Sequence, residues 1–339
     1  MKKYANGQVS LLPQERIVDI DDFLRKNRQC YKVPSILPAC PKIIAIGDLH
    51  GDFDALMISL KRAGIIDSQG SWVAGSTIVV QVGDVLDRGG RGSSVTSKDD
   101  LEELQILNFL YKLNRQALLC NPPGRVITLL GNHELMNMIG DFRFATKEHI
   151  SGFGGFENRK NLFEPGGQMA RRMACNSLGV VMIGDWVFVH GGLLPEHLHT
   201  VAKMSGGVSR PKVVLDRINN LVRGILRGKI KLENIGREEE SILFGGDGIF
   251  WTRKYSQGNV SREICNDAYD TLSLLGIDRK KGGIVIGHTP QNSINSVCDN
   301  RIWRIDTGMS EAFGHRPGQH GRIEVLEILQ NGESVGVIH

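Results

Sequence analysis

The residues with the clearest chemistry in this sequence are carboxylates and imidazoles that follow short apolar runs. The run Thr77–Val82 ends in a glycine turn that carries Asp84, Asp87 and Arg88. Two nearby carboxylates repel each other and lose hydration unless a cation neutralises them. The turn therefore indicates a cation site, although a solvated Asp-Gly turn is an equal alternative for so short a motif.

The same arrangement recurs four more times, which argues against that alternative. The other apolar runs are Ile43–Ile46, Val126–Leu130, Val187–Val189 and Ile284–Ile286, and the polar residues that follow them are Asp48, His50, Asn132, His133, His190 and His288. In open α/β sheets, ligands bind beyond the carboxyl ends of the strands. We therefore expect all five polar endings to gather at one edge of one sheet.

The donor atoms in this set are oxygens and imidazole nitrogens, with no thiolate among them. Such a set suits manganese, iron or zinc better than it suits a structural zinc site of the cysteine type. Asp84 follows the central strand, so it is the natural bridge between two ions about 3.5–4 Å apart. That arrangement is used for in-line attack at phosphorus by an acidified hydroxide between the ions.

Three further residues of these motifs predict the rest of the chemistry. His133 follows the candidate ligand Asn132 and is expected to point elsewhere, which leaves it available as a proton donor to the leaving oxygen. Asp87 is expected to hold that imidazole oriented and charged. Arg88 supplies a planar fork for phosphate oxygens.

The elements that must position these residues alternate as strand, helix, strand, helix. Asp52 is expected to cap a helix that begins at Phe53. Apolar periodicity predicts further helices at about Leu101–Leu119, Gln168–Leu178 and Val213–Ile225. Near the end of the chain, Arg301–Asp306 and Arg322–Leu329 alternate like two antiparallel strands.

The pattern of elements also predicts how the chain is divided. Residues 1–41 are expected to be an irregular lead-in that contains a short helix near Ile20–Asn27, and residues 42–329 to form one catalytic domain. Segments 135–180 and 206–248 interrupt the alternation, so we expect them to be insertions that cap the sheet edge. Residues 330–339 are expected to be a tail.

Composition narrows the class of protein. With 41% hydrophobic and 23% charged residues, the chain is typical of a globular domain. The net charge of +4 is mild and the basic runs are short, so nucleic acid is not an expected partner. No apolar run predicts a membrane span or a secretory signal. The six cysteines are scattered without a CxxC motif, which indicates reduced thiols and a cytoplasmic protein.

The motifs GDLHGD, GDVLDRG, GNHE, HGG and GHT, in this order, resemble those of the metallophosphoesterase fold and its phosphoprotein phosphatase superfamily. The stretches GNHELMNMIGDFRF, VFVHGGLLPEH and IFWTRKYS are similar to the Shewanella-like protein phosphatases within it. The resemblance covers roughly residues 42–329. It implies an α/β (α+β) fold, a β-sandwich flanked by helices, in place of a single doubly wound sheet.

The resemblance also implies roles for individual residues. Two divalent or trivalent ions are implied, the first bound by Asp48, His50 and Asp84, and the second by Asp84, Asn132, His190 and His288. It pairs His133 with Asp87 for proton donation and makes Glu134 an outer-sphere group. The phosphate-binding arginines that it implies are Arg88, then Arg253 as a candidate and Arg143 as a weaker one, for which a cap salt bridge is an equal alternative.

The expected function is hydrolysis of phosphoserine and phosphothreonine in proteins, with phosphotyrosine as a further substrate class. The expected partner is accordingly a phosphoprotein or phosphopeptide, and no oligomeric state is indicated. One alternative is a dinucleoside polyphosphate hydrolase of the same superfamily, which tends to replace the residue at Asp87. Another is a non-catalytic binding module, against which the complete ligand set argues.

Overall fold

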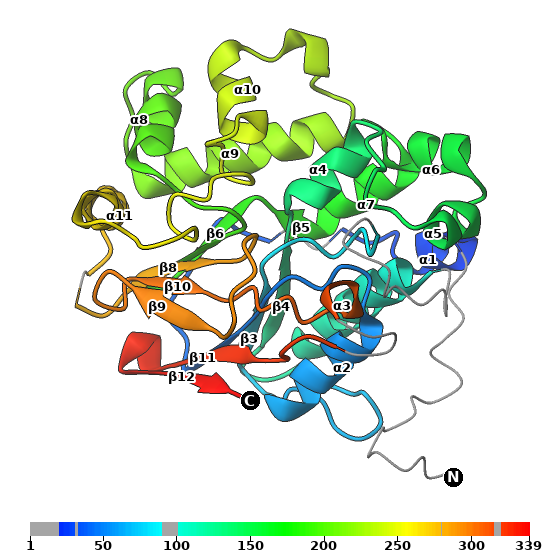
Figure 1. Cartoon of the computed structure of the whole chain (residues 1–339), viewed down its shortest axis with the longest axis horizontal. Coiled ribbons are helices and arrows are strands. Elements are labelled where there is room, and N and C mark those ends of the chain that lie inside the picture. Colours follow the sequence, from blue (N-terminus) through cyan, green and yellow to red (C-terminus); the bar gives the residue numbers. More distant parts are fainter. Residues whose placement is uncertain (1–19, 31–32, 90–100, 279, 315–319) are drawn as a thin grey trace.

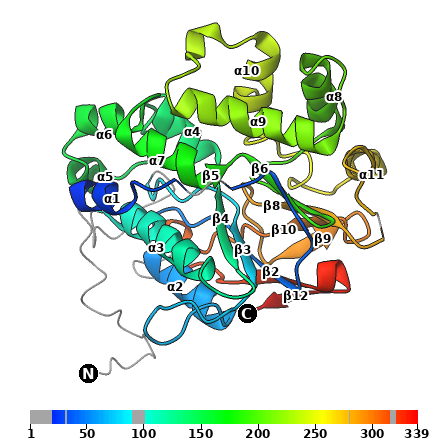
Figure 2. The ribbon, with the colours of Figure 1, turned by 180° about the vertical axis from the view of Figure 1, so that it is seen from behind.

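The computed structural model describes residues 20–30, 33–89, 101–278, 280–314 and 320–339. They form two mixed six-stranded sheets with helices around them (Figures 1 and 2). Sheet A has the order β1 (Ile36–Leu37), β6 (Val180–Ile183), β7 (Trp186–Val189), β8 (Gly283–Ile286), β10 (Ile302–Arg304) and β9 (Asn295–Val297). Sheet B has the order β12 (Ser334–Ile338), β11 (Val325–Leu329), β2 (Lys42–Ile46), β3 (Ile78–Gln81), β4 (Arg125–Leu129) and β5 (Ser177–Leu178).

The two sheets pack face to face because alternate residues of their strands are apolar on both sides. In β2, Ile43 and Ala45 belong to the core that lies between the sheets. Their neighbours Ile44 and Ile46 belong to the core beneath the helices. Successive side chains of a strand point to opposite faces, so one unbroken apolar run serves both cores. The expected β-sandwich flanked by helices is confirmed.

The helices lie on the outer faces and at one end of the sandwich (Figures 1 and 2). The described α-helices are α1 (Ile20–Lys26), α2 (Phe53–Arg62), α3 (Glu102–Ala117), α4 (Asn132–Met138), α5 (Lys147–Gly152), α6 (Phe156–Phe163), α7 (Gln168–Asn176), α8 (Pro195–Met204), α9 (Pro211–Leu226), α10 (Arg237–Phe244) and α11 (Arg262–Leu274). Short 3-10 turns occur at η2 (Leu232–Asn234), η3 (Glu311–Phe313) and η4 (Gln330–Gly332). Among the residues described, no helix combines the length and apolar character that crossing a membrane requires.

Several expected helices are present. The N-cap of α2 is Asp52, whose side chain accepts a hydrogen bond from the amide of Ala55 at 2.8 Å. The predicted helices near 101–119, 168–178 and 213–225 appear as α3, α7 and α9, and the short one near Ile20 appears as α1. Residues 1–19 and 31–32 of the lead-in, and residues 90–100 before α3, lie outside the described residues.

The arrangement of strands differs from expectation in four respects. Residues 36–37, expected within an irregular lead-in, form β1, the edge strand of sheet A that pairs with β6. The five strands with polar endings are divided between two sheets, three in sheet B and two in sheet A. The segments around 301–306 and 322–329 form β10 and β11, which lie in different sheets and do not pair with each other. Residues 334–338, expected within a tail, form the edge strand β12 beside β11. Strand partners far apart in sequence decided these outcomes, and local patterns do not encode them.

The prediction of six reduced thiols is wrong for four cysteines. Disulfides join Cys30 to Cys175 and Cys265 to Cys298, whereas Cys40 and Cys120 are free. The paired cysteines are 145 and 33 residues apart in the sequence, so their local spacing does not predict the disulfides. The cytoplasmic location stays a prediction.

Candidate active site

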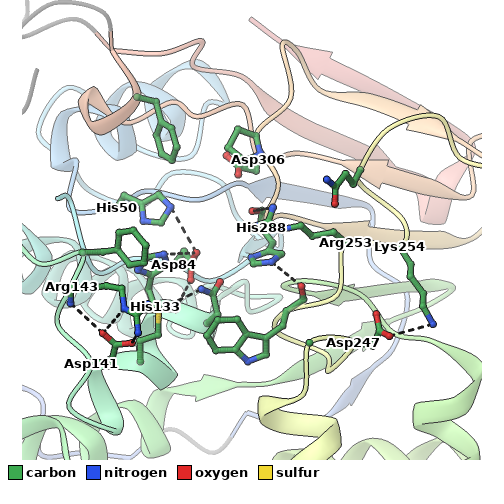
Figure 3. A pocket seen from close by; sticks show the side chains of 18 of the residues that line it. His50, Asp84, His133, Asp141, Arg143, Asp247, Arg253, Lys254, His288 and Asp306 are labelled. Atoms are coloured by element: carbon green, nitrogen blue, oxygen red, sulfur yellow. Dashed lines mark hydrogen bonds and ion pairs between the residues drawn. The ribbon is translucent and has the colours of Figure 1, made fainter. Parts of the chain in front are cut away.

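The carboxyl ends of strands from both sheets converge on one pocket of about 1000 Å³ (Figure 3). The strands β2, β3 and β4 run parallel to one another in sheet B, and β7 runs parallel to β8 in sheet A. The pocket is lined by His50, Asp84, Asn132, His133 and His288 of the expected set. The other two expected donors, Asp48 and His190, are buried beside it.

Asp84 lies at the centre of the donor atoms. Its Oδ2 is 3.8 Å from Nε2 of His50, 3.3 Å from Nε2 of His190 and 3.8 Å from Nε2 of His133. Burial would raise the pKa of Asp84, but its interactions with the neighbouring rings of His190, His133 and His50 outweigh burial and bring that pKa well below its usual value. Asp84 is therefore an anion in reach of donors on both sides, as a bridging ligand must be.

Backbone carbonyls fix which nitrogen of each candidate histidine ligand faces the pocket. Nδ1 of His50 lies 3.1 Å from the carbonyl oxygen of Leu86, and Nδ1 of His190 lies 3.1 Å from that of Val82. A carbonyl can only accept, so Nδ1 carries the proton and Nε2 offers its lone pair to the pocket. His288 has the opposite orientation, with Nε2 3.0 Å from the carbonyl oxygen of Trp251.

Several polar atoms of the site lack a hydrogen-bond donor within the part of the chain that the structure describes, and they show whether metal ions would fit there. Nε2 of His190 faces Oδ1 of Asn132 at 2.9 Å, so two lone pairs converge. Oδ1 of Asp48 is buried without a hydrogen-bond partner among the described residues. Burial, with the charges of Asp306 and Asp84, raises the pKa of Asp48 well above its usual value. A cation would relieve each of these conflicts, so the residues present fit a metal centre.

The neutral form of His288 also suits a ligand. Burial, with the charges of His190 and Arg253, lowers the pKa of His288 to about 3. Two triplets have donor atoms that all lie within 4.8 Å of one another, namely His50 with Asp84 and His133, and Asp84 with His190 and His288. Distance alone therefore does not distinguish the expected proton donor, His133, from the candidate metal ligands. The hydrogen-bond partner of His133 does differ from those of the histidine ligands.

That partner is Asp87. Nδ1 of His133 lies 2.8 Å from Oδ2 of Asp87, where the three candidate histidine ligands have carbonyls. The amide of Asn137 donates to both oxygens of Asp87, at 3.0 and 2.9 Å. The carboxylate fixes the ring with Nε2 toward the pocket, and it stabilises an imidazolium, the form that can give up a proton.

The backbone is strained at four of the expected site residues. His50, Asp84, Asp87 and His288 have φ values of 42°, 52°, 69° and 68°, in the left-handed region that side chains rarely adopt. Such conformations cost about 1–3 kcal/mol each and persist where surrounding structure enforces them. A side chain at Gly131 would lie 2.1 Å from Oδ1 of Asp84, so glycine is required there.

Glu134 holds the backbone of Asp84 in its left-handed conformation. Its two carboxylate oxygens accept hydrogen bonds from the backbone amides of Asp84, Val85, Leu86 and Gly131, at 3.0, 2.9, 3.1 and 2.6 Å. With its oxygens engaged in this way, Glu134 holds the turn after β3 against the start of α4. This geometry matches the expected outer-sphere position.

The three expected arginines have different surroundings. Arg253 lines the pocket, and its Nη1 lies 3.1 Å from the carbonyl oxygen of His288 and 2.7 Å from Oγ1 of Thr289. Arg143 also lines the pocket, but its exposed side chain pairs with Asp141 at 2.7 Å. Arg88 is not among the lining residues, and its guanidinium pairs with Glu102 and Glu311.

Sequence reasoning missed Asp306 as a pocket residue. It is 1% exposed and follows β10, whose end meets the same pocket (Figure 3). The signal was weak, because Arg304 interrupts the apolar residues of Ile302–Ile305, although an aspartate and, after one residue, a glycine follow them. Arg159, buried behind Asp87, was also missed, and it has no comparable motif.

Comparison with known proteins agrees with this geometry. The model of the calcineurin-like phosphoesterase family matches residues 41–304. Shewanella-like protein phosphatase 2 of Arabidopsis thaliana is 35% identical, over 86% of this chain and 75% of that protein. Shewanella-like protein phosphatase 1 of Plasmodium berghei (strain Anka) is 31% identical, over 79% of this chain and 67% of that protein.

Solved structures show the same fold. The cold-active protein-tyrosine phosphatase of a psychrophilic Shewanella species superposes with a TM-score of 0.67 at 23% identity, over 93% of this chain and 84% of that one.

Proposed function

The chain belongs to the calcineurin-like phosphoesterase family and, within it, to the Shewanella-like protein phosphatases, and from this premise we propose that it hydrolyses phosphoserine and phosphothreonine in proteins. It is a metal-dependent phosphatase, and the proposal concerns which phosphoryl groups it removes. The observation that carries the proposal is the His133–Asp87 pair beside the donor cluster.

A proton donor matters most for serine and threonine. Their alkoxide leaving groups are far more basic than the phenolate of tyrosine, whose conjugate acid has a pKa of about 10. General acid catalysis is worth about 10²–10⁴-fold where the leaving group needs a proton. A site that keeps His133 oriented by Asp87 is therefore equipped for alkyl phosphates. Phosphotyrosine is a further substrate class, because a pocket of about 1000 Å³ also admits an aromatic ring.

We assign the remaining site residues as follows. Asp48, His50 and Asp84 would hold one ion, and Asp84 with Asn132, His190 and His288 would hold the other. When bound, two ions of manganese, iron or zinc would supply Lewis acidity for activating water and neutralising phosphoryl oxygens. Arg253 and Arg143 both line the pocket, and we assign the binding of a phosphoryl oxygen to Arg253 first, because the side chain of Arg143 is exposed and paired with Asp141.

A turnover panel tests the proposal. The purified protein, supplied with manganese, is assayed on one peptide sequence carrying phosphoserine, phosphothreonine or phosphotyrosine, and on diadenosine tetraphosphate. We expect kcat/KM to be highest on phosphopeptides, with measurable turnover of phosphoserine. Asp84→Asn is the matched control for contaminating activity. Turnover confined to the dinucleotide would overturn the proposal and favour the polyphosphate hydrolase alternative, and turnover of phosphotyrosine alone would overturn the serine and threonine assignment.

A further inference from the structure

A buried guanidinium lies behind the His133–Asp87 pair. Arg159, on α6, has no exposed surface, and its Nη2 lies 3.3 Å from Oδ1 of Asp87. The other oxygen of Asp87, Oδ2, is the one that faces Nδ1 of His133. Asp87 therefore bridges an arginine from the helical segment after β4 and the imidazole that faces the pocket.

Two more residues join Arg159 to this carboxylate. Nη1 of Arg159 lies 2.9 Å from Oε2 of Glu103, and the Oε1 of Glu103 accepts the backbone amide of Asp87 at 2.8 Å. Nε of Arg159 donates to Oδ1 of Asn137 at 2.9 Å, which turns the NH2 group of Asn137 toward Asp87. Arg159 thus sets both the charge and the hydrogen-bond direction around Asp87.

Arg159 cannot leave this position to bind substrate. Its guanidinium carbon lies 5.5, 4.7 and 5.2 Å from the ring centroids of Phe142, Phe153 and Phe163. Rings around a cation add attraction and block other rotamers. Arg159 is also not among the residues that line the pocket. Its action on a reaction there must pass through Asp87.

A purely structural role explains this arrangement poorly. Well-packed apolar residues in place of a buried ion pair are often neutral or stabilising, because burying the charges costs hydration. The planar guanidinium of Arg159 contacts both oxygens of Glu103 and one oxygen of Asp87, and so fixes the two carboxylates relative to each other, which apolar packing does not do.

We propose that Arg159 is a positioning residue for proton donation, which orients Asp87 and through it His133. The inference rests on the proposed role of His133 as the acid. It makes the helical segment α4–α6 part of the reaction machinery, because the segment supplies His133, Asn137 and Arg159.

The test compares leaving groups. Arg159→Lys keeps the charge but loses the fork, and Arg172→Lys, a half-buried arginine on α7 that donates to the carbonyl of Leu24, is the matched control. Each variant, with its manganese content measured, is assayed on a series of substituted phenyl phosphates and on phosphoserine peptide. For Arg159→Lys we expect a loss of about tenfold or more in kcat on phosphoserine, and of less than about threefold on p-nitrophenyl phosphate. Arg172→Lys should show neither loss.

A second comparison separates positioning from general damage. In a His133→Asn background, Arg159→Lys should lower kcat by less than about twofold, because residues that act as a unit are not additive. Should Arg159→Lys fail to fold, Asn137→Leu removes the amide bridge and should give the same selective loss. Equal losses on all leaving groups, or additive losses with His133→Asn, would overturn the inference.

Failure of the underlying proposal gives a different result. His133→Asn alone should lose about 10²–10⁴-fold on phosphoserine and much less on p-nitrophenyl phosphate. If that variant loses activity equally on both, His133 is not the acid and the proposed function fails at that point. If it is selective but Arg159→Lys is not, only the positioning role is wrong.

Discussion

Nη2 of Arg88 lies 2.6 Å from Oε2 of Glu311, a residue 223 positions later in the chain. The arginine that the sequence predicts to bind phosphate is thus already paired with carboxylates, since Glu102 is its other partner. Both ion pairs are largely buried, so water and salt screen the attraction within each less than in a surface pair. If Arg88 binds a phosphoryl oxygen, the phosphoryl group must compete with Glu311.

The first prediction follows from that competition. Glu311→Gln removes one competing charge, so we expect the inhibition constant for inorganic phosphate to fall by roughly threefold to tenfold. Arg88→Ala should instead weaken phosphate inhibition and raise KM together. Steady-state inhibition assays measure both. An unchanged inhibition constant in both variants would show that Arg88 is a structural cation of the loop.

The second prediction concerns the bridging carboxylate. Asp84→Asn removes the charge shared by both candidate ion sites, so activity and metal content should fall together. Metal analysis of the purified variant checks this. Removing metal from the native protein with a chelator should also lower Tm, because a ligand at 100 times its Kd stabilises by about 2.7 kcal/mol. An active Asp84→Asn protein that retains two ions would contradict the assignment.

The third prediction separates the two arginines of the pocket wall. Arg253 is held against the loop of His288 by two hydrogen bonds, whereas Arg143 is exposed and paired with Asp141. A pre-positioned fork loses less freedom on binding phosphate. We expect Arg253→Ala to raise KM for a phosphopeptide by about tenfold or more, and Arg143→Ala by less than about threefold. The reverse order would transfer the phosphate-binding role to Arg143.

The fourth prediction concerns stability and pH. Nδ1 of His320 lies 2.8 Å from Oδ2 of Asp52. Burial opposes the charged form of each group, but each partner outweighs it, so the pKa of His320 is raised above 6.5 and that of Asp52 is lowered below 3.8. The stabilisation from His320 is complete below pH 6.5 and is lost as pH rises through the raised value. That from Asp52 is present above pH 3.8 and is lost as pH falls through the lowered value.

His320→Gln should therefore lower Tm most between about pH 4 and 6.5, and progressively less toward pH 9. Differential scanning calorimetry at several pH values measures the difference from the native protein. His199→Gln, which changes an exposed histidine of α8, is the matched control. A Tm difference that does not change with pH would mean that the pair makes no electrostatic contribution to stability.

Local sequence predicted the parts of this protein that local physics determines. An apolar β-branched run followed by glycine and a polar residue predicted β2, β3, β4, β7 and β8. The carboxylate of Asp52 beside an apolar helical face predicted α2 and its cap. The expected donors of the site were found because each follows directly after one of these strands.

Partners distant in the chain could not be predicted in the same way. The pairing of Arg88 with Glu311 joins loops that follow different strands, and the burial of Arg159 behind Asp87 depends on how α6 packs. The motif around Arg88 indicated a site residue but not its carboxylate partner, and the local sequence of Arg159 does not differ from that of an arginine on a solvated surface. The apolar pattern likewise did not predict that the strands divide between two sheets. A strand buried on both faces has the same pattern in a single doubly wound sheet and in a sandwich of two sheets.

The pairing of β11 with β2 has a consequence for how the enzyme folds during its synthesis. β2 leads directly to Asp48 and His50, yet one of its two neighbours, β11, is made only when synthesis reaches Val325–Leu329. A chain leaving the ribosome from its N-terminus therefore carries the first donors long before the strand that pairs with β2 on its other side. Activity should appear only once nearly the whole chain has emerged. A substitution that disrupts β11 near residue 325 should therefore destabilise β2 and the donors that follow it, although these lie near the other end of the sequence.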